Sequence, residues 1–423
     1  MNKELINKKP DKISKNFWSF PWLYRESFLF ALILLFTGIL LEVITPTRGI
    51  SVPAFPHNMF ALMIFVITLA FLHFFYRKSL IVKWLTSVPA AISSICLLAV
   101  VILLLGLLKQ ENQPESVLTA IGFTHVKNSW ILILAQIYLL TVLGLVVFKR
   151  IAKLRKQNIG FLLNHAGLWI VIAAASLGTG DLQRLKMELH KGETIWYAYD
   201  DQNRVYELPF AVELKNFHID EYPPKMAIVD SKTGKLIENL NSSLPEIHSE
   251  KEVCLGNYHI VVKDYLPAGW PFEGRFVESG KTGAPPAAKV FVANRQNNDT
   301  ISGWISTGSF MVSPAYLFLT ENEVLAMTQP EPRKYQSQVK IYTKEDDPYE
   351  EVIEVNAAPK VNGWHLYQVS YDQNRGKWSE LSVLEVVRDP WLYIVYFGIA
   401  MLLGGAVYIL WMGTDFGHGE SVR

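Results

Sequence analysis

The chain has 423 residues, a formal net charge of +1 at pH 7 and only two cysteines. A net charge so close to zero provides no broad basic surface, which argues against a nucleic-acid partner. Half of the residues are hydrophobic, and they gather in long runs before about residue 180 and after about residue 390. This segregation predicts an integral membrane protein with one large water-soluble insertion.

Uncharged apolar runs predict the membrane-spanning helices, because each run is close to the ~20 residues that a bilayer requires. Six such runs are found, at residues 27–45, 58–76, 85–108, 130–148, 160–179 and 391–412. The first run is the weakest of them, because Glu42 lies near its end. No small-residue cleavage site follows that run, which favours a retained span over a cleaved signal peptide.

Lysine and arginine predict the orientation, because they are retained on the cytoplasmic side of a membrane. They cluster before the first run and in the loops after the second and fourth runs, whereas the alternate loops carry few. Both termini are therefore expected in the cytoplasm. The expected parts are a basic tail (1–26), two N-terminal spans (27–84), a three-span core (85–179), an external domain (180–389), a last span (390–412) and a second tail (413–423).

The external domain is expected to be β-rich, since short alternating runs separated by Pro, Gly and Asn clusters are typical of strands. KMAIVDSKTGKLI predicts a hairpin around Lys-Thr-Gly, and residues 264–288 are expected to form a long irregular loop. Many short strands at this spacing predict a sandwich or open barrel. The predicted fold class is thus an α-helical integral membrane protein with about six transmembrane helices and a large extracytoplasmic β-rich domain.

His165 is the first candidate site residue. It lies about six residues into the fifth apolar run, roughly 9 Å from its cytoplasmic end at ~1.5 Å rise per residue. It could form an interhelical hydrogen bond to a Ser or Thr, worth about 1 kcal/mol, and Gly167 and the small residues 173–176 support close packing. It could instead ligate a buried cofactor, for which haem iron is the natural apolar guest. Composition alone favours neither interpretation.

His73, near the cytoplasmic end of the second run, could supply a second axial position at a comparable depth. Its aromatic neighbours 74–76 favour an interfacial belt instead. The histidines of the external domain form no HxxxH or HExxH pair and are expected to be structural or exposed: His190, His218, His248, His259 and His365. His57 and His125 are expected in short external loops. Cys96 is expected in lipid and Cys254 as a small buried apolar residue. Without a Cys-x-x-Cys pair, no metal knuckle or redox pair is predicted.

Three segments together resemble the ResB/CcsB family, subunits of the System II cytochrome c synthase. FLLNHAGLWIVIAAASLGTGDLQRLKMELHKGE, residues 161–193, places a histidine in a span before a polar strand that ends His-x-Gly-Glu. NGWHLYQVSYDQNRGKWSELSVLEVVRDPW, residues 362–391, ends in the Asp-Pro that begins the last span. FAVELKNFHIDEYPPKMAIVD, residues 210–230, is similar to the family's first external strands. The resemblance covers roughly residues 85 to 412, so the two N-terminal spans depart from the family's four-span pattern.

The resemblance implies that His165 is an axial ligand of haem that is bound non-covalently in transit. No family position covers His73. It also implies a CcsA-like membrane partner and apocytochrome c outside, at the inner membrane of a bacterium, with a periplasmic β domain. The expected function is haem delivery and ligation, with the thioether chemistry mostly on the partner and no catalytic residue assigned in this chain.

Two rival functions remain open. One is a membrane-anchored sensor or scaffold whose β domain binds an external ligand, with His165 as a packing residue. The other is a small-solute transporter with a histidine relay, which would need several intramembrane charges and broken helices. The apolar runs are almost free of both, so the transporter ranks last.

Overall fold

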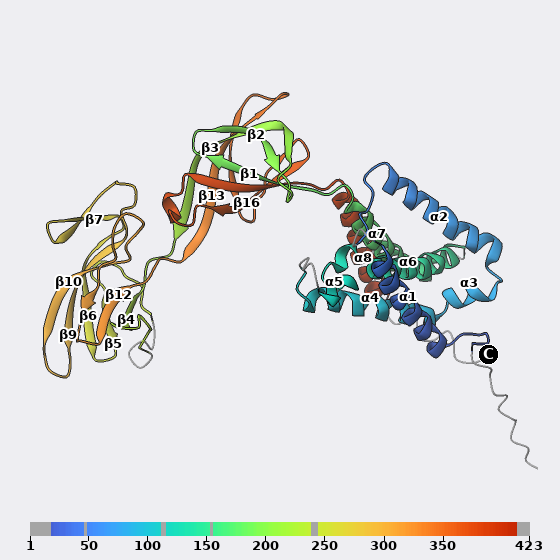
Figure 1. Ribbon diagram of the computed structural model, residues 1–423, viewed down its shortest axis with the longest axis horizontal. Helices are drawn as coiled ribbons and strands as arrows, with labels where there is room; N and C mark the ends of the chain where they lie inside the picture. The colour runs from blue at the N-terminus through green and yellow to red at the C-terminus, as the bar shows by residue number, and fades with distance from the viewer. Residues whose placement is uncertain (1–17, 46–48, 111–115, 153–154, 238–243, 413–423) are drawn as a thin grey trace, which may run out of the picture. The chain divides into compact units, whose positions relative to one another are not determined.

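The computed structural model describes residues 18–45, 49–110, 116–152, 155–237 and 244–412. The expected tail 413–423 and most of the expected tail 1–26 lie outside these residues. Contacts divide the chain into two units (Figure 1). We call Met1–Leu182 with Asp389–Arg423 the membrane unit, and Gln183–Arg388 the β unit.

Within the described residues, six helices are long and apolar enough to cross a membrane, which confirms the predicted number. They are α1 (Tyr24–Ile44), α2 (His57–Tyr76), α4 (Val88–Leu107), α6 (Trp130–Ile151), α7 (Ile159–Gly178) and α8 (Leu392–Met412). Each coincides closely with an apolar run, because backbone groups in hydrocarbon must be hydrogen-bonded within the helix. The shorter helices α3 (Leu80–Leu85) and α5 (Val117–Ala120) lie in connections.

Helix α6 is the most enclosed helix of the membrane unit. Half of the most apolar 18-residue stretch of α6 is buried, against 11% of the corresponding stretch in α2 and in α8. Helices α2 and α8 therefore lie at the periphery. Helices α7 and α8 pack through glycine: a Cβ on Gly167 would lie 2.7 Å from the carbonyl oxygen of Gly398. Small residues allow two helix backbones to approach closely in a membrane, so substitution at this contact would force the helices apart.

The β unit contains two hydrophobic cores. The first lobe is an eight-stranded antiparallel sheet with strand order β14-β13-β3-β2-β1-β17-β16-β15. Its strands are β1 (Gln183–His190), β2 (Thr194–Tyr199), β3 (Val205–Glu221), β13 (Pro332–Thr343), β14 (Tyr349–Glu354), β15 (Lys360–Val361), β16 (Trp364–Tyr371) and β17 (Leu381–Arg388). Met187, Leu214 and Leu366 are fully buried in its core.

The second lobe is inserted in sequence between β3 and β13. It has a four-stranded sheet, β10-β9-β6-β5, and a three-stranded sheet, β11-β12-β4, around a core that includes Ile228, Ile260 and Leu325. Its strands are β4 (Met226–Asp230), β5 (Glu252–Leu255), β6 (Tyr258–Leu266), β9 (Ala287–Asn294), β10 (Thr300–Ser306), β11 (Leu317–Phe318) and β12 (Glu323–Met327). The β-rich prediction is confirmed, with two cores in place of one.

Of two local predictions, one differs from the structure and one is confirmed. The expected loop 264–288 contains a hairpin, β7 (Gly269–Phe272) and β8 (Arg275–Glu278), whose two connecting residues, Glu273 and Gly274, both have positive φ as a tight hairpin turn requires. The expected hairpin at KMAIVDSKTGKLI is found around the Lys-Thr-Gly turn: Val229 forms an antiparallel bridge with Leu236, and the backbone N–H of Ile237 donates to the carbonyl oxygen of Ile228 at 3.2 Å. Strand β4 also pairs with β12.

Candidate functional site

His165 is fixed in one orientation by its own helix. Its Nδ1 lies 2.9 Å from the carbonyl oxygen of Phe161, one turn earlier in α7. Its ring stacks on the Phe161 ring with centroids 3.7 Å apart and planes inclined by 18°. Because a carbonyl oxygen only accepts hydrogen bonds, Nδ1 carries the proton and the lone pair of the neutral imidazole is on Nε2.

The Nε2 of His165 makes no hydrogen bond among the described residues. The packing interpretation requires an interhelical bond to a Ser or Thr, and the described contacts of His165 lie instead within α7. A partly buried imidazole whose Nε2 carries the lone pair, and has no hydrogen-bond partner among the described residues, is the arrangement that a metal ligand needs.

The neighbours of His165 lie in the interfaces of α7 with α8 and with α6. Asn164 faces α8, since a Cβ on Gly405 would lie 2.9 Å from the Asn164 nitrogen. Trp169 faces α6 and donates its Nε1–H to the carbonyl oxygen of Leu140 at 3.0 Å. With 3.6 residues per turn, His165 projects on the Trp169 side of the helix and away from the α8 contact.

His73 is buried among aromatic rings. Its ring lies 6.1 Å from the Phe148 ring of α6 at an inclination of 24°, and 5.4 Å from the ring of Phe74. No hydrogen bond or ring contact in the described part of the chain joins His73 to His165. The structure therefore gives no support to a shared site, and the aromatic surroundings favour the interfacial interpretation.

A buried acid–base pair joins α1 to the segment before α6. The sequence patterns did not predict this pair. The Nε2 of His125 lies 2.6 Å from Oε1 of Glu42, and their side chains are 11% and 1% exposed. The backbone N–H of Trp130 donates to Oε2 of Glu42 at 3.0 Å. The sequence signal was the lone glutamate in an apolar run, where a charge without a partner is costly.

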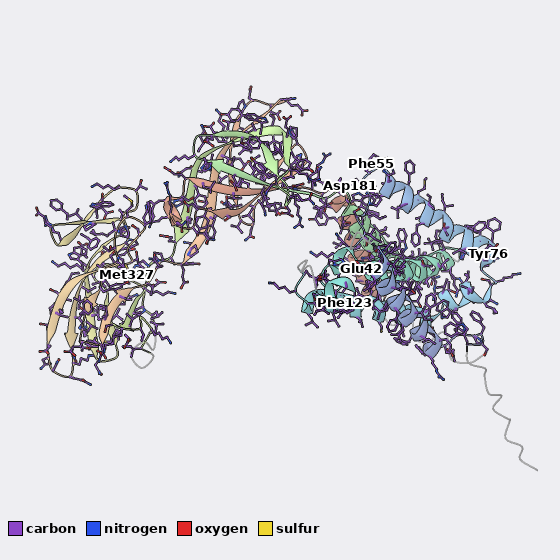
Figure 2. The ribbon with its side chains drawn as sticks, in the orientation of Figure 1. Glu42, Phe55, Tyr76, Phe123, Asp181 and Met327 are labelled. Carbon is purple, nitrogen blue, oxygen red and sulfur yellow. The ribbon has the colours of Figure 1, made fainter. Side chains whose placement is uncertain are left out.

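A second polar cluster lies where α2, α7 and α8 have their ends. Asp181 accepts hydrogen bonds from the backbone N–H of Phe55 at 2.7 Å, from Nδ2 of Asn58 at 2.7 Å and from Nε1 of Trp391 at 2.6 Å; Figure 2 labels Asp181 and Phe55. Burial opposes ionisation of the carboxyl, but these three donors outweigh it and hold the pKa of Asp181 below its usual range.

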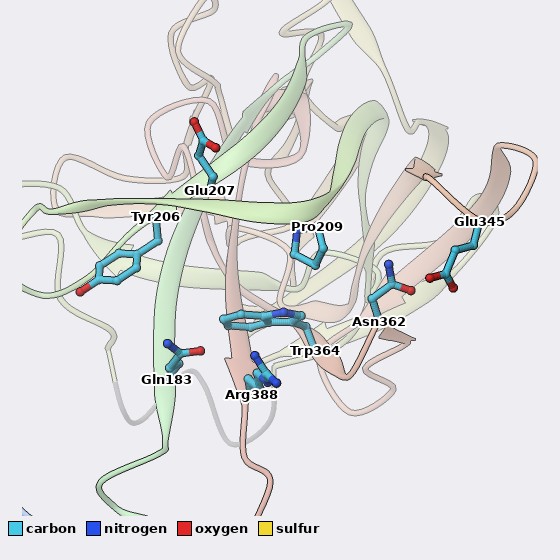
Figure 3. A pocket seen from close by; sticks show the side chains of 8 residues that line it. All are labelled: Gln183, Tyr206, Glu207, Pro209, Glu345, Asn362, Trp364 and Arg388. Atoms are coloured by element: carbon cyan, nitrogen blue, oxygen red, sulfur yellow. The ribbon is translucent and has the colours of Figure 1, made fainter. Parts of the chain in front are cut away.

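A hollow of about 630 Å³ opens on the first lobe of the β unit (Figure 3). Trp364 is buried beneath it, and the Arg388 guanidinium carbon lies 5.9 Å from the Trp364 ring centroid. The lining residues are Gln183, Tyr206, Glu207, Pro209, Glu345, Asn362, Trp364 and Arg388. The mixture of an aromatic floor with polar and charged walls suits a small polar ligand or a peptide side chain.

The remaining histidines and cysteines form no further candidate site among the described residues. In the described residues, no three or more His, Cys, Asp or Glu side chains gather in a group that could hold a metal ion. His57 is the first residue of α2, not a loop residue. The expectation that Cys254 is buried is wrong: it is exposed on the edge strand β5, where Leu255 takes the inward position, and Arg295 donates to its sulfur at 2.8 Å.

No family model and no curated protein matches this chain. The resemblance to the ResB/CcsB family therefore depends on the three quoted segments and on the order of spans and β domain.

Proposed function

We propose that this protein is a membrane subunit of a System II cytochrome c maturation complex, in which His165 is an axial ligand for haem iron. One observation carries the proposal: the Nδ1–H of His165 donates to the Phe161 carbonyl, and no described residue bonds to its Nε2. Metal-bound histidines commonly donate their other ring N–H to a carbonyl or carboxylate, which fixes the tautomer and orients the ring.

The surroundings of His165 fit haem in chemistry. The imidazole lies in a helix of apolar and small residues, and an apolar macrocycle prefers such surroundings to water. When bound, haem would supply the porphyrin that is linked to exported apocytochromes by thioether bonds. A CcsA-like partner would supply the other ligand of the iron, since no hydrogen bond or ring contact among the described residues joins His73 to His165.

The β unit is assigned to the periplasm, where it would present apocytochrome c. An unfolded chain can add to the free edge of a sheet. The eight-stranded sheet has β14 and β15 at its edges, and the four-stranded sheet has β10 and β5. In this role the protein is a non-catalytic or co-catalytic subunit, and its lipid contacts are those of a multi-pass protein of the bacterial inner membrane.

The alternative is a membrane-anchored sensor or scaffold without haem. The hollow above Trp364 favours it, because a ligand site in the β unit would serve an external signal.

The two functions are separated by His165→Ala in the full chain, purified with its CcsA-like partner. Haem absorption should fall to near zero and cytochrome c maturation should stop, while protein level changes little because the lost hydrogen bond lies within one helix. Added imidazole should restore part of both, since it fills a vacant coordination position. His73→Ala is the matched control and should keep its haem. Unchanged haem content in His165→Ala would overturn the proposal in favour of the scaffold.

A further inference from the structure

Arg150 lies at the end of α6, beside the ring that covers His165. Its guanidinium carbon is 4.9 Å from the centroid of the Phe161 ring, within the range of a cation–π contact. The same Phe161 ring stacks on His165. Two successive contacts therefore connect the guanidinium to the imidazole, and α6 and α7 each supply one end of this column.

The hydrogen-bonding capacity of Arg150 is largely unused. A guanidinium has five N–H donors, and Nη1 makes one long bond, 3.4 Å, to Oδ1 of Asn158. Among the described residues no carboxylate pairs with Arg150. The sequence also has no Asp or Glu between residues 149 and 180. A cation that lies on an aromatic face, with no carboxylate partner among the described residues, can bind an anionic group of a ligand.

We propose that Arg150 is a positioning residue that binds a carboxylate of the ligand held by His165, an inference that rests on the proposed function. For haem, this carboxylate is a propionate. The planar fork of arginine matches a carboxylate in two parallel hydrogen bonds, which fixes orientation as well as adding affinity. Attachment at two points, the iron and one carboxylate, would define how the macrocycle is presented.

A phospholipid headgroup could supply the same anionic oxygens, because basic residues at the ends of spans attract anionic lipid. The stacking of Arg150 on the ring that also covers His165 favours the ligand carboxylate. The two sources differ in one testable respect: only the ligand loses its charge when its propionates are esterified.

The test titrates the full chain, in discs of zwitterionic lipid, with haem and with haem dimethyl ester. Wild type should bind haem more tightly than the ester. Arg150→Gln should weaken haem binding roughly tenfold and leave ester binding unchanged, because one charge-assisted pair is lost. Arg150→Lys should retain part of the preference. Lys149→Gln removes an adjacent charge of the same helix and should change neither affinity by more than about twofold.

The other possible results overturn either the role of Arg150 or the proposed function. Equal losses for haem and ester in Arg150→Gln, or an equal loss in Lys149→Gln, would mean that Arg150 acts through the helix or through general charge. Unchanged haem binding in Arg150→Gln, together with less anionic lipid co-purifying with this variant before it is placed in discs, would assign Arg150 to headgroups. Both results overturn only this inference. Absence of haem binding to wild type, alone and with its partner, would overturn the proposed function as well.

Discussion

Glu42 shows how a single carboxylate can be accommodated inside the membrane unit. Both of its oxygens have partners, His125 at 2.6 Å and the Trp130 backbone N–H at 3.0 Å. A buried charge retains most of its desolvation cost unless close donors offset it. The pair therefore attaches the end of α1 to the start of α6, and it explains why an apolar run with a glutamate at its end is a stable helix here.

Removing one member of this pair should be strongly destabilising. In His125→Ala, Glu42 stays buried with only the Trp130 donor, so the free energy of unfolding should fall by about 3–5 kcal/mol. The double variant Glu42→Gln with His125→Ala should lose less, because no charge is left unpaired. Thermal unfolding in detergent measures both. His218→Ala is the control, since its pair with Asp220 is solvent-exposed. If His125→Ala lowered the unfolding temperature as little as His218→Ala, this account would be contradicted.

At the scale of elements, Asp181 joins three helices whose ends are far apart in sequence. Its carboxylate accepts from Phe55 before α2 and from Trp391 before α8, and it follows α7 directly. Asn58 is fully buried and also donates to the Leu177 carbonyl at 3.2 Å. The peripheral helix α2 is thereby attached to the α7–α8 pair at the point where the chain leaves for the β unit and returns.

Asp181 gives this attachment a pH dependence. Its folded-state pKa is lower than its unfolded value, so the stabilisation is fully present above the unfolded pKa, about 4, and is lost as pH falls through the folded value. Asp181→Asn should therefore be less stable than wild type at pH 7 by about 1–3 kcal/mol, and the difference should shrink under acid. Thermal unfolding against pH measures it. Asp264 is an exposed residue of β6, and Asp264→Asn should show the same dependence of unfolding temperature on pH as wild type. If the stability difference between Asp181→Asn and wild type stayed the same at every pH, the assignment would be contradicted.

Sequence patterns predicted where helices and strands form better than they predicted which strands pair and which side chains meet. The six helices follow from apolar length alone, and strands such as β6 follow from alternation. The pairing of β3 with β13 does not, because the second lobe separates these strands in the chain. Glu42 and Asp181 are likewise polar residues whose donors lie elsewhere in the sequence. His165 could be selected because a histidine within an apolar run is itself costly, but only the structure shows that its Nε2 has no hydrogen-bond partner among the described residues.

For the whole molecule, the number of helices and the charges of the loops lead to one arrangement in the membrane. Five of the six long helices precede the β unit and one follows it. If all six cross the membrane, the residues before α1 and after α8 lie on the same side, opposite the β unit. Basic residues near the ends of α2 and α6, among them Arg77, Lys78, Lys149 and Arg150, predict that their side is cytoplasmic.

This arrangement predicts the activity of reporters that function only outside the cytoplasm. A reporter inserted in the exposed turn between β9 and β10, at about residue 297, should be active, and the turn should tolerate it because its backbone contributes no core residue. A reporter fused after Arg150 should be silent. A reporter that requires the cytoplasm should give the opposite pattern at both positions, which controls for expression. Activity after Arg150 with silence at the β9–β10 turn would reverse the orientation. It would also contradict the proposed function, in which the end of α7 that carries His165 faces the cytoplasm and receives haem from there.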